Sequence, residues 1–204
     1  EKVVESSSYG EELRGGEKKA ESVGQLLQAP KVLSENYGRI HLRFDKPISL
    51  AALMKERKLD LAAPVSEEQK RSLVRALGHA VMYGISRVST VTPHALLASA
   101  LLAHKRRGIS AKDVGERVVL LRRIATDLQA PLSAQLEGAP SSPSTLGPIA
   151  DALAMFAGQG MAKTVEALSE PIYQLEDDKR AELAFYKNTL LNLVAGRTIV
   201  ASAV

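Results

Sequence analysis

Residues 92–108, TPHALLASALLAHKRRG, carry a full set of helix signals and favour a helical fold. Thr92 is a typical N-cap residue, and Pro93 suits the first helical position because its missing N–H would have no partner there. Apolar residues recur at helical spacing, at Leu96, Leu97, Ala100 and Leu101. Gly108 is expected to end this helix, where the cations of HKRRG, residues 104–108, would complement its carbonyl groups.

Three more helices are predicted from the same kind of pattern. One begins after residue 64 with a capping box of Ser66 and Gln69, and its apolar stripe is expected to comprise Leu73, Leu77, Val81, Ile85 and Val88. Another begins at Ser110 and carries Val114, Val118, Leu121, Ala125 and Leu128. The last begins near Asp177 and places Leu183, Tyr186, Leu190 and Val194 on one face.

Between the helices, other patterns predict a strand, a linker and a hairpin. Strict alternation of Ile40, Leu42 and Phe44 with polar residues predicts a half-buried strand that ends before Pro47. Residues 131–148 hold four prolines and four serines, which predicts a linker. A short helix is expected near 148–158, and residues 161–175 are predicted to form a β-hairpin.

Composition restricts the chemistry of the chain. It has 204 residues, a net charge of +4 and no cysteine, which excludes disulfides, thiolate metal sites and cysteine nucleophiles. The mild excess of positive charge suits an anionic partner, such as a phosphate ester, a CoA-like ligand, an anionic lipid surface or nucleic acid. No uncharged apolar run is long enough to span a bilayer. The chain opens without a Met and closes within an apolar helical pattern, so we expect a piece of a longer protein.

The side chains that carry chemistry form no catalytic or metal-binding motif. His41, His79, His94 and His104 are not spaced as metal ligands, so no metal site is predicted. The HKRRG cations either complement a helix end or contact a phosphate or lipid headgroup. Arg117, Arg122 and Arg123 either extend that patch or line a solvated face, which is the more ordinary arrangement.

The order of elements after residue 92 resembles that of a winged helix: helix, helix, a later helix and then a hairpin. Such modules bind DNA in many proteins and pack against neighbouring proteins in others. No helix in this region shows an arginine-rich face with Asn or Gln for base recognition. A winged-helix-like binding module without enzymatic activity is therefore the alternative function.

Several blocks of the sequence resemble the glycerol-3-phosphate acyltransferases of the bacterial and mitochondrial type. SYGEELRGGEKKAES, residues 8–22, is similar to the family block S-Y-x-x-E-L-x-G-x-x-K-x-x-E-S. YGRIHLRFDKPISL, residues 37–50, resembles a family strand, although Asp45 replaces its usual glycine. STVTPHALLASALL and LAFYKNTLLNL, residues 89–102 and 183–193, resemble later blocks, with Thr189 in place of an asparagine.

The resemblance implies a parent enzyme whose catalytic motifs lie upstream. The family's H-x-x-x-x-D block supplies a histidine base, and none of the four histidines here has Asp five residues later. The F-P-E-G-x-R-S block is also absent, and EKVVE at residues 1–5 looks like the tail of the last core block. The chain is thus expected to be a segment of an acyltransferase and inactive alone, with no catalytic residue. A degenerate fragment without activity is a third possibility.

By this resemblance, the parent enzyme transfers an acyl group from acyl-CoA or acyl-carrier protein to the sn-1 hydroxyl of glycerol 3-phosphate. It needs no cofactor besides that co-substrate. The family acts at the cytoplasmic face of the bacterial inner membrane, so a peripheral contact with the membrane surface and no nucleic-acid partner are expected. Lys18 is the first candidate for contact with phosphate or the acyl donor, followed by Arg14 and Lys19. Salt bridges on a helix surface are the alternative role for these residues.

The predicted fold is mainly α with a minor β contribution. Residues 1–63 are expected to be the C-terminal part of an α/β acyltransferase domain. Residues 64–204 are expected to form a helical domain that contains the linker 131–148 and the small β-hairpin 161–175.

Overall fold

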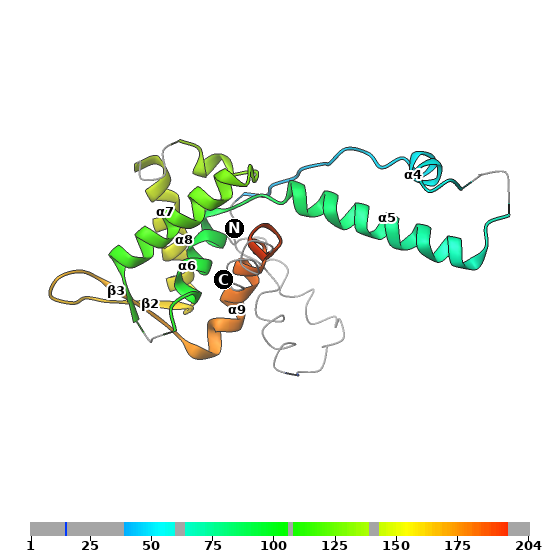
Figure 1. Ribbon diagram of the computed structural model, residues 1–204. Coiled ribbons are helices and arrows are strands. Elements are labelled where there is room, and N and C mark those ends of the chain that lie inside the picture. The colour runs from blue at the N-terminus through cyan, green and yellow to red at the C-terminus, as the bar shows by residue number, and fades with distance from the viewer. Residues whose placement is uncertain (1–14, 16–38, 60–63, 106–107, 139–142, 196–204) are drawn as a thin grey trace, which may run out of the picture. The chain divides into compact units, whose positions relative to one another are not determined.

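The computed structural model describes residues 15, 39–59, 64–105, 108–138 and 143–195, and it divides into two compact units (Figure 1). Residues 42–90 form one of them, here named the α5 unit. The other joins residues 1–41 to residues 91–204, and its part from Val91 onward is here named the bundle unit. Each unit is described by itself.

Helix α6, Pro93–Leu102, lies at the centre of the bundle unit. Thr92 caps it as predicted, because its hydroxyl accepts a hydrogen bond from Ala95 N at 3.3 Å. Eight of the ten residues of α6 are buried. A helix that is apolar on all sides needs neighbours on all sides, and α6 packs against three helices: α7 (Ala111–Asp127), α8 (Pro143–Gly158) and α9 (Arg180–Asn188).

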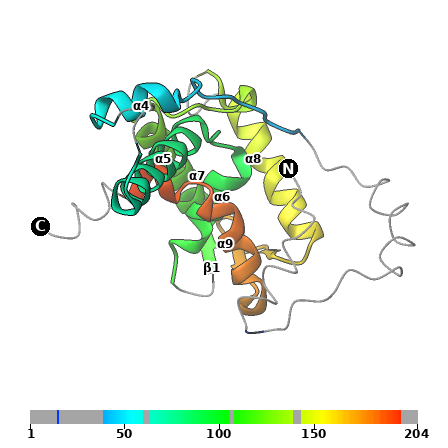
Figure 2. The same ribbon diagram turned by 90° about the vertical axis from the view of Figure 1, so that its right-hand side faces the viewer.

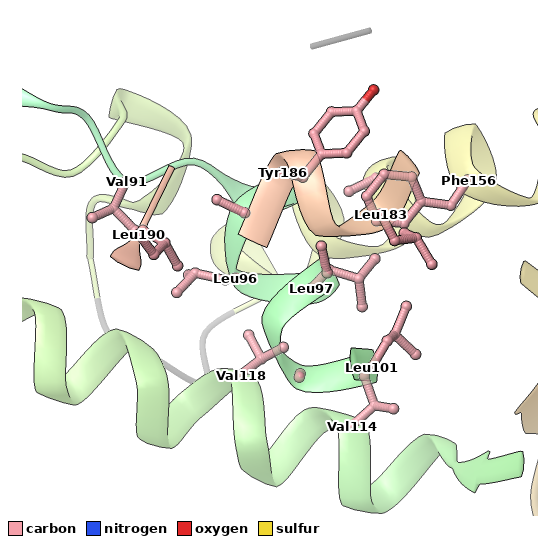
Figure 3. Close-up of a cluster of buried hydrophobic side chains, with 14 of the residues drawn as sticks. Val91, Leu96, Leu97, Leu101, Val114, Val118, Phe156, Leu183, Tyr186 and Leu190 are labelled. Carbon is pink, nitrogen blue, oxygen red and sulfur yellow. The ribbon is translucent and has the colours of Figure 1, made fainter. Parts of the chain in front are cut away.

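The core of the bundle unit forms where these helices meet (Figure 3). Leu97 and Leu101 of α6 lie between Val114 and Val118 of α7 on one side and Leu183 of α9 on the other (Figure 3). The predicted stripes of α7 and α9 therefore both face α6. Figure 2 shows the crossing of α6, α7, α8 and α9 from a second direction.

A three-stranded antiparallel sheet completes the bundle unit. Its strands are β1 (Gly108–Ser110), β2 (Ala162–Val165) and β3 (Ile172–Leu175), in the order β1-β3-β2. The β2–β3 pair confirms the predicted hairpin within 161–175. With α6, α7 and α8, the sequence of elements is helix, strand, helix, helix, strand, strand, and the strand order is that of a winged helix.

Val91, the first residue of the bundle unit, makes two backbone hydrogen bonds to the segment after α7. Its N–H donates to Pro131 O at 2.8 Å, and its carbonyl accepts from Ser133 N at 2.9 Å. The short 3-10 helix η1, Ala134–Leu136, follows and buries Leu136. A second 3-10 helix, η2 (Asp177–Lys179), precedes α9.

The α5 unit begins with residues 42–49, here named the extended segment. The short helix α4 (Leu50–Glu56) and the long helix α5 (Glu67–Val88) follow. The predicted capping box of Ser66 and Gln69 is present at the start of α5. The extended segment approaches α5 closely at Gly84, where a Cβ atom would lie 2.8 Å from Asp45 Oδ2. Asp45 also forms a salt bridge with Arg87, which lies about one helical turn after Gly84.

Three predictions about secondary structure were wrong. Ile40, Leu42 and Phe44 are exposed and form no strand, because alternation yields a strand only where a second strand pairs with it, and the described residues supply none. Helix α6 ends at Leu102 and not at Gly108, which belongs to β1, where an added Cβ atom would lie 2.7 Å from Ile172 Cγ2. The expected linker 131–148 contains η1 and the first turns of α8, which begins at Pro143 and includes Pro148.

The predicted fold class is confirmed in its main features: the described chain is mainly helical with a small antiparallel sheet. The expected α/β part, residues 1–63, falls largely outside the described residues and stays a prediction. In α5, the expected stripe is split: Leu73 and Leu77 are half-buried, whereas Val81 and Ile85 are exposed.

Truncation of a fully buried leucine in α6 tests this architecture. Leu97→Ala is expected to lower the free energy of unfolding by about 2–5 kcal/mol, because Leu97 is fully buried and its neighbours can collapse only in part. Urea denaturation followed by far-UV circular dichroism measures the loss. The matched control is Leu168→Ala, which removes an exposed leucine and should change stability by less than about 0.5 kcal/mol. Equal stabilities of the two variants would contradict the central position of α6.

Candidate functional site

The predicted substrate-binding residues Arg14, Lys18 and Lys19 lie outside the described residues. Their role stays a prediction. Gly15 is described, and its φ of +83° is a left-handed conformation that favours glycine.

The predicted cationic patch lies only partly within the described residues. Lys105 is exposed, and Arg106 and Arg107 lie outside the described residues. Arg117 of α7 donates to Ala100 O, and Arg180 of α9 donates to His104 O, each at 3.5 Å. Cations thus do contact carbonyl groups at the end of α6, but they come from α7 and α9.

Arg122 is the exception to the expectation of a solvated face. Only 4% of its surface is exposed, whereas Arg123 is exposed. Its guanidinium donates to Gly138 O, while Nε and Nη1 have no hydrogen-bond partner. Burial lowers the pKa of Arg122. Two buried N–H donors without partners match the oxygens of a carboxylate or a phosphate, so Arg122 is the most unusual cation among the described residues.

His94 lies in an aromatic cluster within the bundle core. Its ring meets Phe156 edge-on at 5.9 Å between centroids and stacks on Tyr186 at 6.1 Å. Burial lowers the pKa of His94 to about 4, so the imidazole is neutral at physiological pH. This is the environment of a packing side chain. The sequence offered a signal for it, because His94 stands directly before the apolar run ALLASALL.

An acidic hollow of about 360 Å³ opens where β3 passes into η2, and it is lined by Gln174, Leu175, Glu176, Asp177 and Asp178. Glu176 pairs with Lys163 of β2 at 2.6 Å, and this pairing raises the pKa of Lys163. Three carboxylates would repel a phosphate ester. The hollow therefore does not suit the anionic ligands that the net charge favours.

The described residues bring together no metal site. Within 39–59, 64–105, 108–138 and 143–195, no three His, Cys, Asp or Glu side chains gather closely enough to hold a metal ion. In the same ranges, no helix is both long and apolar enough to cross a bilayer. Arg122 is the one buried arginine among the described residues.

Comparison with known protein families shows to which family the chain belongs. Residues 9–204 match the family described as the glycerol-3-phosphate acyltransferase C-terminal region. The chain belongs to this family. The match covers nearly the whole chain, so both the α5 unit and the bundle unit lie within the family region.

Individual relatives agree with this assignment. The glycerol-3-phosphate acyltransferase of Xylella fastidiosa strain M12 is 26% identical over 207 residues, which are 98% of this chain and 23% of that protein. Those of Pseudomonas savastanoi pv. phaseolicola and Pseudomonas fluorescens are 28% and 26% identical, and each alignment covers 99% of this chain and 24% of the relative. The C-terminal region described here thus spans about a quarter of the length of the relatives that it matches.

The buried state of His94 predicts a specific pH dependence. Its pKa of about 4 in the folded chain lies below the ordinary value of 6.5, so the unfolded chain binds more protons between these pH values. Stability is therefore expected to fall as pH falls from 6.5 to 4, with a contribution from His94 of roughly 2–3 kcal/mol. Urea denaturation across this pH range measures it, and His94→Phe should flatten the profile.

His79→Phe, the same substitution at an exposed position of α5, is the matched control. A second measurement is the NMR titration of the His94 imidazole, whose midpoint should lie near 4. A midpoint at the ordinary value of 6.5 would show that the ring is hydrated.

Proposed function

We propose that the chain is the C-terminal region of an enzyme that transfers an acyl group to the sn-1 hydroxyl of glycerol 3-phosphate. The observation that supports it is the family match over residues 9–204, together with relatives that bear the name glycerol-3-phosphate acyltransferase. The acyl donor is acyl-CoA or acyl-carrier protein. The product is lysophosphatidic acid, the first intermediate of phospholipid synthesis.

The reaction is an acyl transfer through attack on a thioester. The hydroxyl oxygen of glycerol 3-phosphate attacks the carbonyl carbon, a C–O bond forms, the C–S bond breaks and the thiol of the donor leaves. A histidine base of the H-x-x-x-x-D block takes the hydroxyl proton. None of the four histidines of this chain stands in that block, so the base comes from upstream of this region and the chain alone is inactive.

The contribution of this chain to binding rests on its N-terminal residues. Lys18, with Arg14 and Lys19, contacts the phosphate of glycerol 3-phosphate or the acyl donor. A lysine ammonium is a compact cation on a flexible stem, which suits a phosphate as a point charge. The positive φ of Gly15 between Arg14 and Lys18 supports a tight backbone turn at this place.

The enzyme acts at the cytoplasmic face of the bacterial inner membrane, which it contacts peripherally. The uneven distribution of charge supports an anionic neighbour. Residues 42–90 contain nine lysines and arginines and five aspartates and glutamates, an excess of four positive charges that equals the net charge of the whole chain, +4. Anionic lipid attracts such a segment, and salt weakens the attraction.

The alternative of a winged-helix-like binding module is favoured by one observation, the element and strand order of the bundle unit. Its surface chemistry does not suit DNA. α8, which occupies the place of a recognition helix, contains no lysine or arginine in residues 143–158, and the connection from β2 to β3, residues 166–171, contains two glutamates. DNA binding requires cations against the phosphates, so the fold serves packing against protein.

Reconstitution with an upstream core tests the proposed activity. The N-terminal part of the Pseudomonas fluorescens relative, which precedes the matched region, is fused ahead of residue 1. We expect no acyl transfer to glycerol 3-phosphate from the chain alone and activity of the fusion about ten-fold or more above that of the upstream part alone. Radiolabelled glycerol 3-phosphate and acyl-CoA or acyl-carrier protein provide the assay. The control is His→Ala in the H-x-x-x-x-D block of the upstream part, which should abolish activity. A fusion no more active than its upstream part would contradict the proposal.

Gel-shift assays with duplex DNA test the alternative. Because neither α8 nor the β2–β3 connection carries a cation, the chain is expected to cause no sequence-selective shift at low or physiological salt. Any weak binding should come from the cations of residues 42–90 and be lost as salt is raised. A shift that depends on DNA sequence would instead support the alternative.

A further inference from the structure

An apolar surface on α5 is left uncovered. It consists of Val74, Gly78, Val81 and Ile85, which recur at helical spacing and are here named the α5 stripe. Val74, Val81 and Ile85 expose 63%, 41% and 54% of their surface. Aliphatic side chains that remain exposed together on one helix face mark a candidate interaction surface.

The neighbouring face of α5 is already occupied. Leu73, Leu77 and Ala80 are half-buried there, and Gly84 is buried against Asp45 of the extended segment. Helix α4 contributes at the same side, because Arg57 at its C-terminal end donates to Ser72 at 3.3 Å. Helix α5 is therefore apolar on two adjoining faces, and the α5 unit covers only one of them.

The α5 unit also lacks a core that could stabilise it alone. Among its described residues, only Met54 and Gly84 are buried. So small a core contributes little stability from hydrophobic burial. A partner that covers the α5 stripe would add apolar burial to the unit.

The extended segment indicates that the partner is a protein. Leu42, Phe44 and Ile48 expose 76%, 85% and 44% of their surface, and within the described residues no strand pairs with this segment. Its backbone N–H and C=O groups require hydrogen-bonding partners once they are taken out of water. Lipid chains offer none, whereas the edge of a sheet in another stretch of polypeptide offers both.

We propose that the α5 stripe is the docking surface for the polypeptide that precedes this C-terminal region in a full-length acyltransferase. The inference rests on the proposed function. The relatives are about four times as long as this chain, and the matched family is described as their C-terminal region, so the additional polypeptide lies on the N-terminal side.

Cysteine labelling tests this proposal, because the chain contains no cysteine of its own. Val81→Cys places a thiol on the α5 stripe, and His79→Cys places one on the exposed polar face of the same helix. Maleimide labelling is followed at the modified peptide by mass spectrometry, in the 204-residue chain and in its fusion to the upstream part of the Pseudomonas fluorescens relative.

We expect the thiol of Val81→Cys to react about ten-fold or more slowly in the fusion than in the chain alone, since docking buries it. The thiol of His79→Cys should react at rates within about two-fold of each other in the two proteins. Equal rates for Val81→Cys would overturn the proposal. Slow labelling already in the chain alone would overturn it too, because another part of this chain or a second copy would then be the occupant. Light scattering distinguishes those two cases.

Vesicles containing phosphatidylglycerol form the third arm. Protection of Val81→Cys by vesicles but not by the upstream polypeptide would assign the stripe to a membrane and overturn the proposal. The acyl-transfer assay on the same fusion separates this inference from the proposed function. If the fusion is active but the thiol of Val81→Cys is not protected, only the docking inference is contradicted. If the fusion is inactive but this thiol is protected, only the proposed function is contradicted.

Discussion

Burial of α6 on every side is the constraint on which the bundle unit depends. A helix with eight of ten residues buried has no face for solvent, so α7, α8 and α9 must each turn an apolar stripe toward it. His94 is the only titratable side chain of α6, and its ring contacts those of Phe156 and Tyr186. Burial lowers the pKa of His94, so the imidazole is neutral there. Hydrophobic burial thus determines both the packing of the helices and the protonation state of the one histidine within it.

Local signals were sufficient for the starts of three capped helices and insufficient for tertiary pairing. Ser66, Thr92 and Ser110 each cap a helix where their sequence context predicted it, because a cap is decided by residues three apart. The strand expected at Ile40, Leu42 and Phe44 depends on a neighbour that alternation cannot specify. The place of Gly108 in β1 likewise depends on β3, which lies far along the chain.

The family was predictable from the sequence, whereas the predicted substrate-binding residues stay a prediction. Block resemblance pointed to the acyltransferase family, which the match over residues 9–204 bears out. The proposed phosphate contacts, Arg14, Lys18 and Lys19, fall outside the described residues. The burial of Arg122 was not predicted, because the periodicity of the sequence does not show which of the two neighbouring arginines is covered. Arg122 is buried, whereas Arg123 is exposed. Its burial follows from the loop that brings Gly138 over α7.

The backbone bonds of Val91 to Pro131 and Ser133 have a consequence for how such proteins can diverge. Residues inserted before Val91 leave both bonds and the cap of α6 untouched, whereas one residue inserted between Val91 and Thr92 would shift the cap away from them. Evolution can therefore lengthen or shorten the chain just ahead of this position while the helices beyond it keep their register.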